Sequence, residues 1–376
     1  MIDRLIVHVG HDKTGTTSLQ ETFTASADAL AAAGLHYRPF DRHLGATAHH
    51  SLTEEWRAGS LGAAPGPKWQ AFAAAARTGA APVALISSEG LVKLPHEKAV
   101  HALKQCATLA RRVDVLIYLR HPVPYACSAV SQGLRLGRTL DDIIAAPPII
   151  RHDKIVQSWR RAHRTAGVGG TVIVRPFRRD IDRSFDLVGD VLSVCGLNVA
   201  DTALTPIRST ANPGLSALAV HLVDWINRER RREPLSQASL APFNHLAGPA
   251  YVLPSAVQES IRRETRAAND WLHHHYGFRL EAAPLAPTPP CPLGEQELAS
   301  LAELVLLSSQ FAFEVEHSRI GWWFGLRSPY PTRRLHHPVF GALQRVRLLR
   351  QFLGPAGRRA RTVHKRLIAP LDEHRP

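Results

Sequence analysis

The sequence predicts an α/β fold with a central parallel sheet flanked by helices and a helical C-terminal region. Short β-rich runs, each apolar and bounded by turn residues, alternate with segments of helical periodicity. Such alternation is typical of βαβ units, whose crossover helices cover both faces of a parallel sheet. The predicted strands are residues 5–9, 83–87, 113–119 and 171–177, with helices after the first, third and fourth.

The first predicted strand runs directly into a glycine-flanked loop and the start of a helix, where residues 8–20 read HVGHDKTGTTSLQ. A turn of this kind gathers backbone N–H groups and the positive end of a helix dipole around one point. A lysine and several hydroxyls add to this surface. We therefore expect the loop to hold the phosphate of a nucleotide through Lys13, Thr14, Gly15, Thr16, Thr17 and Ser18.

The glycine spacing in this loop is that of a Walker loop, because four residues separate Gly10 from Gly15. Thr16, however, occupies the position of the Walker lysine, and Lys13 lies inside the loop instead. No aspartate suited to magnesium stands out in the sequence. An ordinary ATP or GTP site is therefore disfavoured, and no metal ion is expected.

A second anion-binding segment is predicted at the end of the third strand. The β-rich run ends at Arg120, and a helical pattern begins near Pro124, a residue type that suits the first position of a helix. Ser128 follows Arg120 by eight positions and lies about one turn into that helix. Its hydroxyl and the Arg120 guanidinium can then face the same anion.

The two segments together resemble the nucleotide-binding loops of sulfotransferases that use 3′-phosphoadenosine 5′-phosphosulfate. In that family a Lys-(Ser/Thr)-Gly-Thr-Thr core follows the first strand, as residues 13–17 do here, and a strand-end arginine precedes a serine by eight residues. Residues 171–177 and 212–216 show a weaker likeness to bacterial members. The organisation is similar over about residues 1–280, but only the two loops are specific.

The resemblance implies a P-loop-like sulfotransferase fold and transfer of a sulfuryl group from this donor to an acceptor hydroxyl or amine. Lys13 and the loop amides are expected to stabilise the charge that develops on the leaving phosphate. The loop hydroxyls are expected to bind the 5′-phosphate. Arg120 and Ser128 are expected to bind the 3′-phosphate and so to select this donor over ATP.

Glu89 is the first candidate for the base that takes the proton from the acceptor. It follows the second predicted strand and so falls on the edge where the two loops converge. Cytosolic sulfotransferases carry a histidine at this place, and several carbohydrate and bacterial relatives carry a glutamate. Alternatively, Glu89 only stabilises a helix N-terminus through the helix dipole. His11, inside the loop, is the second candidate base.

The composition fits an enzyme with one main domain. With 376 residues, 45% of them hydrophobic, the chain can bury a full α/β core and still carry a further helical region. The expected organisation is an α/β domain over residues 1–283 that includes a helical part at 213–276, a linker and helix at 284–326, and a basic tail at 327–376.

The sequence also indicates a compartment. No apolar run reaches the roughly 18–20 residues that span a bilayer, and the strand-forming residues at the N-terminus leave no room for a signal peptide. The four cysteines form no C-x-x-C pair, which indicates neither a zinc site nor a disulfide framework. A cytoplasmic protein of bacterial type is the simplest expectation.

The net charge of +14 is concentrated near the C-terminus, where residues 327–376 hold twelve Lys or Arg and two acidic residues. Apolar residues at helical spacing between Val339 and Phe352 make part of this segment amphipathic. Such a segment can contact an anionic membrane surface or a polyanionic glycan, or it can be a solvated tail. A nucleic-acid partner is not favoured.

The sequence contains no motif that identifies the acceptor. Sulfotransferases select it with variable segments, expected here at residues 36–70 and 213–276. The family resemblance favours a saccharide or glycolipid hydroxyl over a small phenol or a protein tyrosine. Two other classes of function stay open, a nucleoside-triphosphate kinase or hydrolase and a non-catalytic protein that binds a nucleotide or a polyanion.

Overall fold

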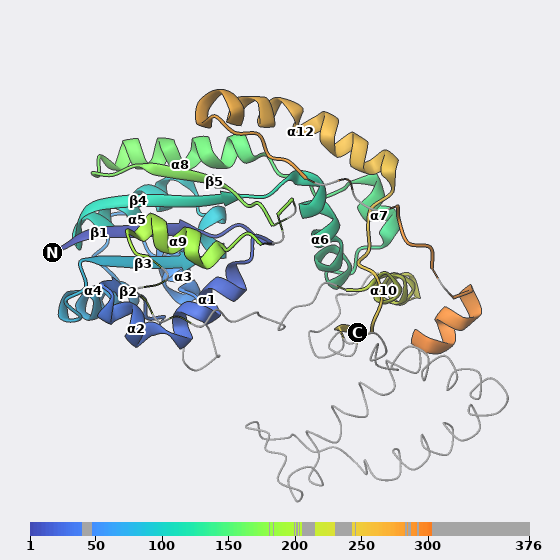
Figure 1. The fold of residues 1–376 in the computed structure, drawn as a ribbon, viewed down its shortest axis with the longest axis horizontal. Helices are drawn as coiled ribbons and strands as arrows, with labels where there is room; N and C mark the ends of the chain where they lie inside the picture. Colours follow the sequence, from blue (N-terminus) through green and yellow to red (C-terminus); the bar gives the residue numbers. More distant parts are fainter. Residues whose placement is uncertain are drawn as a thin grey trace, which may run out of the picture. The chain divides into compact units, whose positions relative to one another are not determined.

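The computed structural model describes residues 1–302 apart from 40–46, 205–214, 230–242 and the positions 180, 183, 199, 201, 203, 245, 283, 285, 286 and 292. Within this part of the chain, five strands form one parallel sheet (Figure 1). They are β1 (Ile2–Val9), β2 (Leu35–His36), β3 (Val83–Ser88), β4 (Ala110–Leu119) and β5 (Val172–Pro176). The predicted α/β class with a parallel sheet is confirmed.

The strand order β2-β3-β1-β4-β5 places β1 between β3 and β4. His8 of β1 pairs with Ser87 of β3 and with Leu116 of β4, so the central strands run in register to the same edge. The Leu5-Ile6-Val7 run of β1 is buried, as expected for a strand that is covered on both faces. The sequence predicted every strand except β2, whose two residues are too few to leave a pattern.

One face of the sheet is covered by helices α3 (His50–Ala58), α4 (Pro67–Thr78), α5 (His96–Ala107) and α8 (His152–Ala166). Side chains of a strand point alternately to the two faces, and this core takes every second residue of the central strands. These residues include Leu5, Val7, Val9, Val113, Val115 and Ile117.

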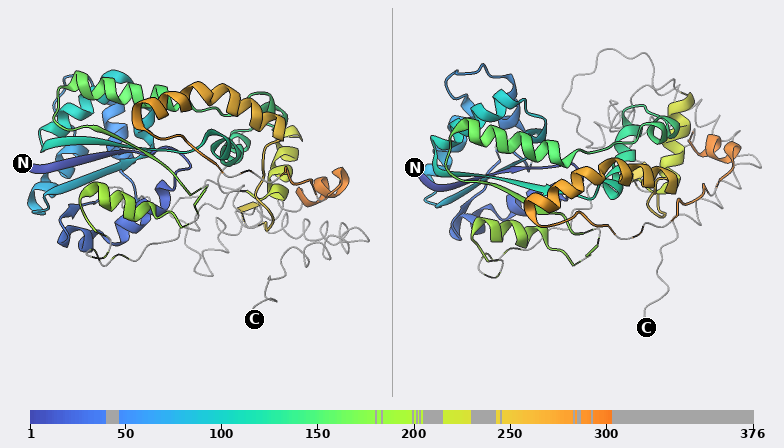
Figure 2. Two further views of the ribbon diagram at one scale, coloured as in Figure 1. Left: turned by 45° about the horizontal axis from the view of Figure 1, so that its top comes forward. Right: turned by 90° about the horizontal axis from the view of Figure 1, so that it is seen from above.

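The other face is covered by α1 (Thr16–Ala25), α2 (Ala27–Ala32) and α9 (Leu187–Cys195). Its core takes the intervening strand residues, which are Ile6, Leu85, Leu116 and Tyr118. Figure 2 shows α8 and α9 on opposite sides of the sheet. The prediction of helices on both faces is therefore confirmed.

The described chain forms two compact units. The first holds the sheet and consists of Met1–Tyr125, Ile149–Ala211 and Gln258–Leu285. The second consists of the described residues within the ranges Ala126–Pro148, Asn212–Val257 and Ala286–Pro376. Helices α6 (Pro122–Arg135) and α12 (Ser255–Tyr276) each begin in one unit and end in the other. The domain boundaries expected from the sequence stay a prediction.

Buried polar contacts hold the second unit together. The Leu140 amide at the start of α7 (Leu140–Ala145) donates to Asp224 of α10 (Ala217–Glu229) at 2.6 Å. The side-chain amide of Asn227, also in α10, donates to the Leu134 carbonyl at 2.8 Å. Buried polar groups of this kind fix the helices because an unpaired partner would be costly.

Helix α6 begins at Pro122, two residues before the predicted start. The ring of His121 explains the difference, because its Nδ1 accepts a hydrogen bond from the Val123 amide at 3.2 Å and so caps the helix. No described helix has both the length and the apolar character that crossing a membrane requires. The predicted basic tail at 327–376 lies outside the described residues.

Candidate functional site

Three segments leave the carboxyl edge of the sheet from neighbouring strands. β1 continues into residues 10–15 and α1, β3 into the 3₁₀ helix η2 (Glu89–Lys93), and β4 into Arg120 and α6. Open parallel sheets bind their ligands at this edge. Three residues predicted to be functional, Lys13, Glu89 and Arg120, follow these strands.

The loop between β1 and α1 has an uncommon backbone. Lys13, with a φ of 67°, and Gly15, with a φ of 77°, both lie in the left-handed region. Between them, the buried Thr14 donates its hydroxyl to the His11 carbonyl at 2.6 Å. A left-handed residue beside a right-handed one turns successive N–H groups toward one side, which is an arrangement that binds anions. The exposed Lys13 side chain adds a positive charge to the loop.

Gly10 and Gly15 allow the loop to pack closely against its neighbours. A Cβ atom on Gly10 would lie 3.1 Å from Thr16 Cγ2 and 3.3 Å from the Glu89 amide nitrogen. A Cβ atom on Gly15 would lie 3.1 Å from Leu187 Cδ2. The two glycines therefore permit both the close approach and, at Gly15, the left-handed turn that starts α1.

Glu89 is in contact with this loop. The hydroxyl of Thr16 donates a hydrogen bond to Glu89 Oε1. Glu89 is also the first residue of η2, which Ser88 caps by accepting from the Gly90 amide at 3.2 Å. The carboxylate thus lies both at the N-terminus of η2 and beside the loop of residues 10–15. This position is compatible with both interpretations from the sequence, in which Glu89 is either the candidate base or a carboxylate that stabilises a helix N-terminus.

Arg120 joins the second predicted segment to the first. Its Nη1 donates to the Lys13 carbonyl at 2.9 Å, across 107 positions of sequence. Its guanidinium carbon lies 5.8 Å from the ring centroid of Phe177, whose own amide donates to the Leu119 carbonyl at 2.7 Å. The hydrogen bond to the Lys13 carbonyl and the cation–π contact with Phe177 both hold the charge of Arg120 beside the loop.

Two buried histidines contact each other, His11 in the loop and His152 at the start of α8. Their rings lie 5.9 Å apart, and burial lowers the pKa of His11 and lowers that of His152 to about 3. Nε2 of His152 lies 2.7 Å from the Arg120 carbonyl oxygen, so this nitrogen carries the proton and donates. Sequence reasoning missed His152, because a single histidine in a helix does not indicate what it contacts.

His11 has a defined tautomer. Its Nδ1 lies 2.9 Å from the Asp12 carbonyl oxygen and must donate, which leaves the lone pair on Nε2. The ring of Tyr125 packs edge-on against His11 at 5.1 Å, and burial raises the pKa of Tyr125 to about 12. A neutral imidazole of this tautomer can accept a proton at Nε2.

The remaining predicted ligands lie on helices. Thr17 and Ser18 are half-buried in the first turn of α1, where backbone N–H groups need acceptors. Ser128 lies on α6 and belongs to the second compact unit, so its predicted pairing with Arg120 stays a prediction. In the described part of the chain, no three His, Cys, Asp or Glu side chains are grouped as a metal site requires.

Comparisons with known proteins returned no match among protein-family models, curated proteins or solved structures. The function must therefore be inferred from the loop, its glycines and the residues that contact it.

Proposed function

We propose that this protein is a sulfotransferase with a P-loop-like fold, which moves a sulfuryl group from 3′-phosphoadenosine 5′-phosphosulfate to an acceptor hydroxyl or amine. The observation that carries this proposal is the hydrogen bond from Arg120 to the Lys13 carbonyl. It joins two segments that the sequence predicts to bind different phosphates of one nucleotide. A donor with phosphate on both sides of its ribose needs two such segments.

The loop of residues 10–18 is the proposed site of the 5′-phosphosulfate. Its left-handed backbone at Lys13 and Gly15 and the dipole of α1 favour an anion there. In this proposal the backbone amide of Thr16 and the hydroxyls of Thr17 and Ser18 donate to the phosphate oxygens, because the Thr16 hydroxyl already donates to Glu89. Lys13 and the amides stabilise the charge that the leaving phosphate gains as sulfur departs, an effect that is strongest in the transition state.

Arg120 is the proposed ligand of the 3′-phosphate, together with Ser128. A guanidinium can form two parallel hydrogen bonds to one phosphate, which makes it more selective than a lysine. The contacts of Arg120 with Lys13 and Phe177 fix its direction before the nucleotide binds, which reduces the entropy lost on binding. No metal ion takes part in the proposal.

Proton removal from the acceptor falls to Glu89 or His11. The acceptor oxygen attacks sulfur as its proton passes to the base, and the bond from sulfur to the bridging phosphate oxygen breaks. Contact with Thr16 places the Glu89 carboxylate at the loop, which favours it as the base. His11 is neutral and has its lone pair on Nε2, which keeps it as the second candidate.

A saccharide or glycolipid hydroxyl is the proposed acceptor, selected by residues 36–70 and 213–276. The predicted basic tail would bring the protein to an anionic membrane surface. The test is incubation of the purified protein with labelled donor and an extract of its host, followed by mass spectrometry for products heavier by one SO₃ group. A labelled product that depends on Lys13 supports the proposal.

Two results would favour the other classes of function. Magnesium-dependent hydrolysis of ATP, without sulfuryl transfer, would indicate a nucleoside-triphosphatase. Tight binding of adenosine 3′,5′-bisphosphate with no transfer to any component of the extract would indicate a non-catalytic binding protein.

A further inference from the structure

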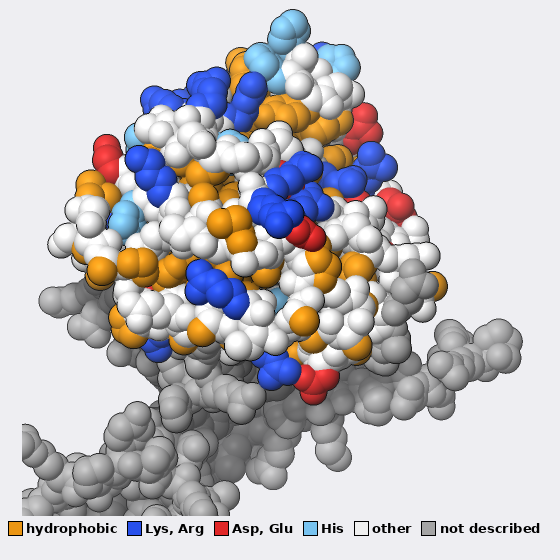
Figure 3. Space-filling view, turned by 90° about the vertical axis from the view of Figure 1, so that its left-hand side faces the viewer, with side chains coloured by type: hydrophobic (Ala, Val, Ile, Leu, Met, Phe, Trp, Pro, Cys, Tyr) orange, Lys and Arg blue, Asp and Glu red, His pale blue; other side chains and the backbone are white. Residues whose placement is uncertain are grey.

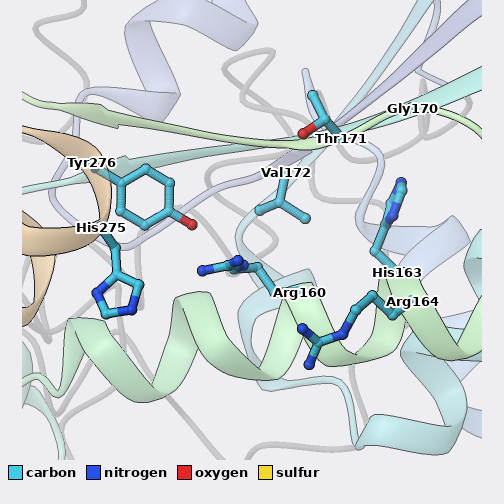
Figure 4. A pocket seen from close by; sticks show the side chains of 8 residues that line it. All are labelled: Arg160, His163, Arg164, Gly170, Thr171, Val172, His275 and Tyr276. Carbon is cyan, nitrogen blue, oxygen red and sulfur yellow. The ribbon is translucent and has the colours of Figure 1, made fainter.

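A groove lies between the exposed side of α8 and the end of α12, within the first compact unit. It encloses about 590 Å³ and is lined by Lys154, Gln157, Ser158, Arg160, Arg161, Arg164, Trp271 and His275. A second hollow of about 290 Å³ adjoins it and shares Arg160, Arg164 and His275 as lining residues. Figure 4 shows Arg160 and Arg164 extending from α8, opposite Tyr276 and His275 at the end of α12.

The groove is separate from the loop of residues 10–18. His152, at the start of α8, bonds the Arg120 carbonyl at the carboxyl edge of the sheet. His163, near the end of the same helix, bonds the Val113 carbonyl at 2.9 Å, near the amino end of β4. The groove therefore follows α8 away from the candidate nucleotide site.

The lining of the groove is strongly basic. It contains Lys154, Arg160, Arg161 and Arg164 and no acidic side chain. Among the described residues, none of these four forms an ion pair with a carboxylate. Figure 3 views the molecule from the amino ends of the strands, where Lys, Arg and His side chains outnumber acidic ones on the upper part of the face. The charge of the groove is therefore available to a ligand.

The charges are arranged in a line. Lys154, Arg161 and Arg164 are exposed on one side of α8, while Val156 and Trp159 on the other side are buried. Arg164 follows Lys154 by ten positions, which corresponds to about 15 Å along a helix. A single phosphate or sulfate ion spans only part of this length. An extended chain with several negative groups can contact the whole row.

The aromatic rings of the groove are already in contact with its own residues. Trp271 stacks on His275 with ring centroids 4.3 Å apart, and the Arg160 guanidinium lies 6.0 Å from the Tyr276 ring centroid. Single-stranded nucleic acids gain much of their affinity from bases stacked on aromatic rings. The row of charges also lies in a hollow between two helices, whereas a bilayer surface is flat. These two features favour a slender anionic chain without bases.

We propose that this groove binds a linear anionic saccharide chain, with Arg161 and Arg164 contacting its sulfate or carboxylate groups. Arginine suits such groups because its planar guanidinium can bind two of their oxygens together. The inference goes beyond the proposed function, since binding of the chain requires neither the nucleotide nor turnover.

The test compares two double variants of the full-length protein that have the same change in net charge. Arg161→Gln/Arg164→Gln changes the groove, and Arg262→Gln/Arg263→Gln changes exposed arginines of α12 that do not line it. Fluorescent dextran sulfate of defined length is titrated at about 0.1 M salt and at higher salt, where exposed charges are screened. Any contribution of the predicted basic tail is the same in both variants.

We expect the groove variant to bind dextran sulfate at least about tenfold more weakly than the wild type, and the α12 variant to change by less than about twofold. The salt dependence of the groove variant should also be shallower by about two ions, because two arginines that displace counterions from the saccharide have been replaced. Melting temperature and binding of adenosine 3′,5′-bisphosphate should be the same in both variants, which separates this inference from the nucleotide site.

Equal weakening in the two variants, or none in either, would overturn the proposal. Polyuridylate and vesicles with an anionic lipid are titrated in parallel. Weaker binding that is specific to the groove variant for either of these probes, with dextran sulfate unaffected, would overturn the saccharide assignment and identify the other partner class.

Discussion

The hydroxyl of Thr16 donates a hydrogen bond to the carboxylate of Glu89, and this contact ties the start of α1 to the start of η2. Thr16 occupies the place where a Walker loop carries its lysine. Here the residue at that position orients a carboxylate beside the loop of residues 10–15. A carboxylate has two oxygens, so Oε2 can face an acceptor while Oε1 is held by Thr16.

Glu89→Gln should reduce turnover by about 10²–10⁴, because the amide cannot act as a base. The amide oxygen can still accept the hydrogen bond from Thr16, so the melting temperature and the nucleotide affinity should change little. Steady-state kinetics and calorimetry on the variant measure these quantities. Glu97→Gln, which changes an acidic residue in the first turn of α5, is the matched control for removal of a helix-dipole interaction.

If Glu89→Gln keeps its activity and melts earlier, Glu89 acts only at the helix terminus. His11 then becomes the base to test, through His11→Gln and the pH dependence of turnover.

Lys13 allows a test that separates charge from backbone strain. Its φ of 67° costs a residue with a side chain on the order of 1 kcal/mol relative to glycine. Lys13→Ala should lower turnover by about two to three orders of magnitude with little change in stability. Lys13→Gly should show the same fall in activity but melt no earlier than the alanine variant, since glycine tolerates this backbone. Near-normal turnover in both variants would contradict the role of Lys13.

Much of the fold could be predicted from the sequence because its strands are apolar, buried on both faces and bounded by turn residues. β2 could not, since the burial of Leu35 and His36 depends on pairing with a distant strand, β3. The helix predicted to begin near Pro124 begins at Pro122, where the ring of His121 caps it, and sequence patterns do not show that interaction.

The residues of the candidate site that follow strand ends could be predicted from the sequence. The contacts that depend on the tertiary fold could not. Lys13 and Arg120 were identified separately, yet their hydrogen bond depends on the order of the strands. His152 reaches the site from a helix that begins 32 positions after Arg120. The left-handed backbone conformation of Lys13 could not be predicted from the sequence either, because lysine has no preference for that conformation.

Buried histidines should make the stability of the protein fall in mild acid. Burial lowers the pKa of His8 to about 4 and those of His49 and His152 to about 3, whereas in the unfolded chain each titrates near 6.5. Between these values the unfolded state binds more protons, so its free energy falls relative to the folded state as the pH falls. Each histidine should lower the free energy of unfolding by up to about 1.4 kcal/mol per pH unit below pH 6.5.

Urea unfolding at several pH values between 7.5 and 5 measures this decrease. His8→Asn should make the dependence shallower, while His273→Gln, at an exposed position at the end of α12, should leave it unchanged. A free energy of unfolding that stays constant over this range would contradict the prediction.

In the proposed function Arg120 selects the nucleotide, and its contact with the Lys13 carbonyl affects how the experiment is interpreted. The wild type should bind adenosine 3′,5′-bisphosphate at least about tenfold more tightly than 5′-AMP, since charge-assisted hydrogen bonds contribute about 1.5–3 kcal/mol each. Arg120→Ala should remove most of this preference. Because Arg120 also donates a hydrogen bond to the Lys13 carbonyl, the Arg120→Ala variant can loosen the loop and weaken the binding of both ligands. The ratio of the two affinities is therefore the quantity to compare.

Arg120→Lys keeps the charge but not the paired geometry and should retain an intermediate ratio. Arg77→Ala removes an exposed arginine of α4 and should keep the wild-type ratio. Equal affinities of the wild type for the two ligands, measured by calorimetry, would refute the sulfotransferase proposal.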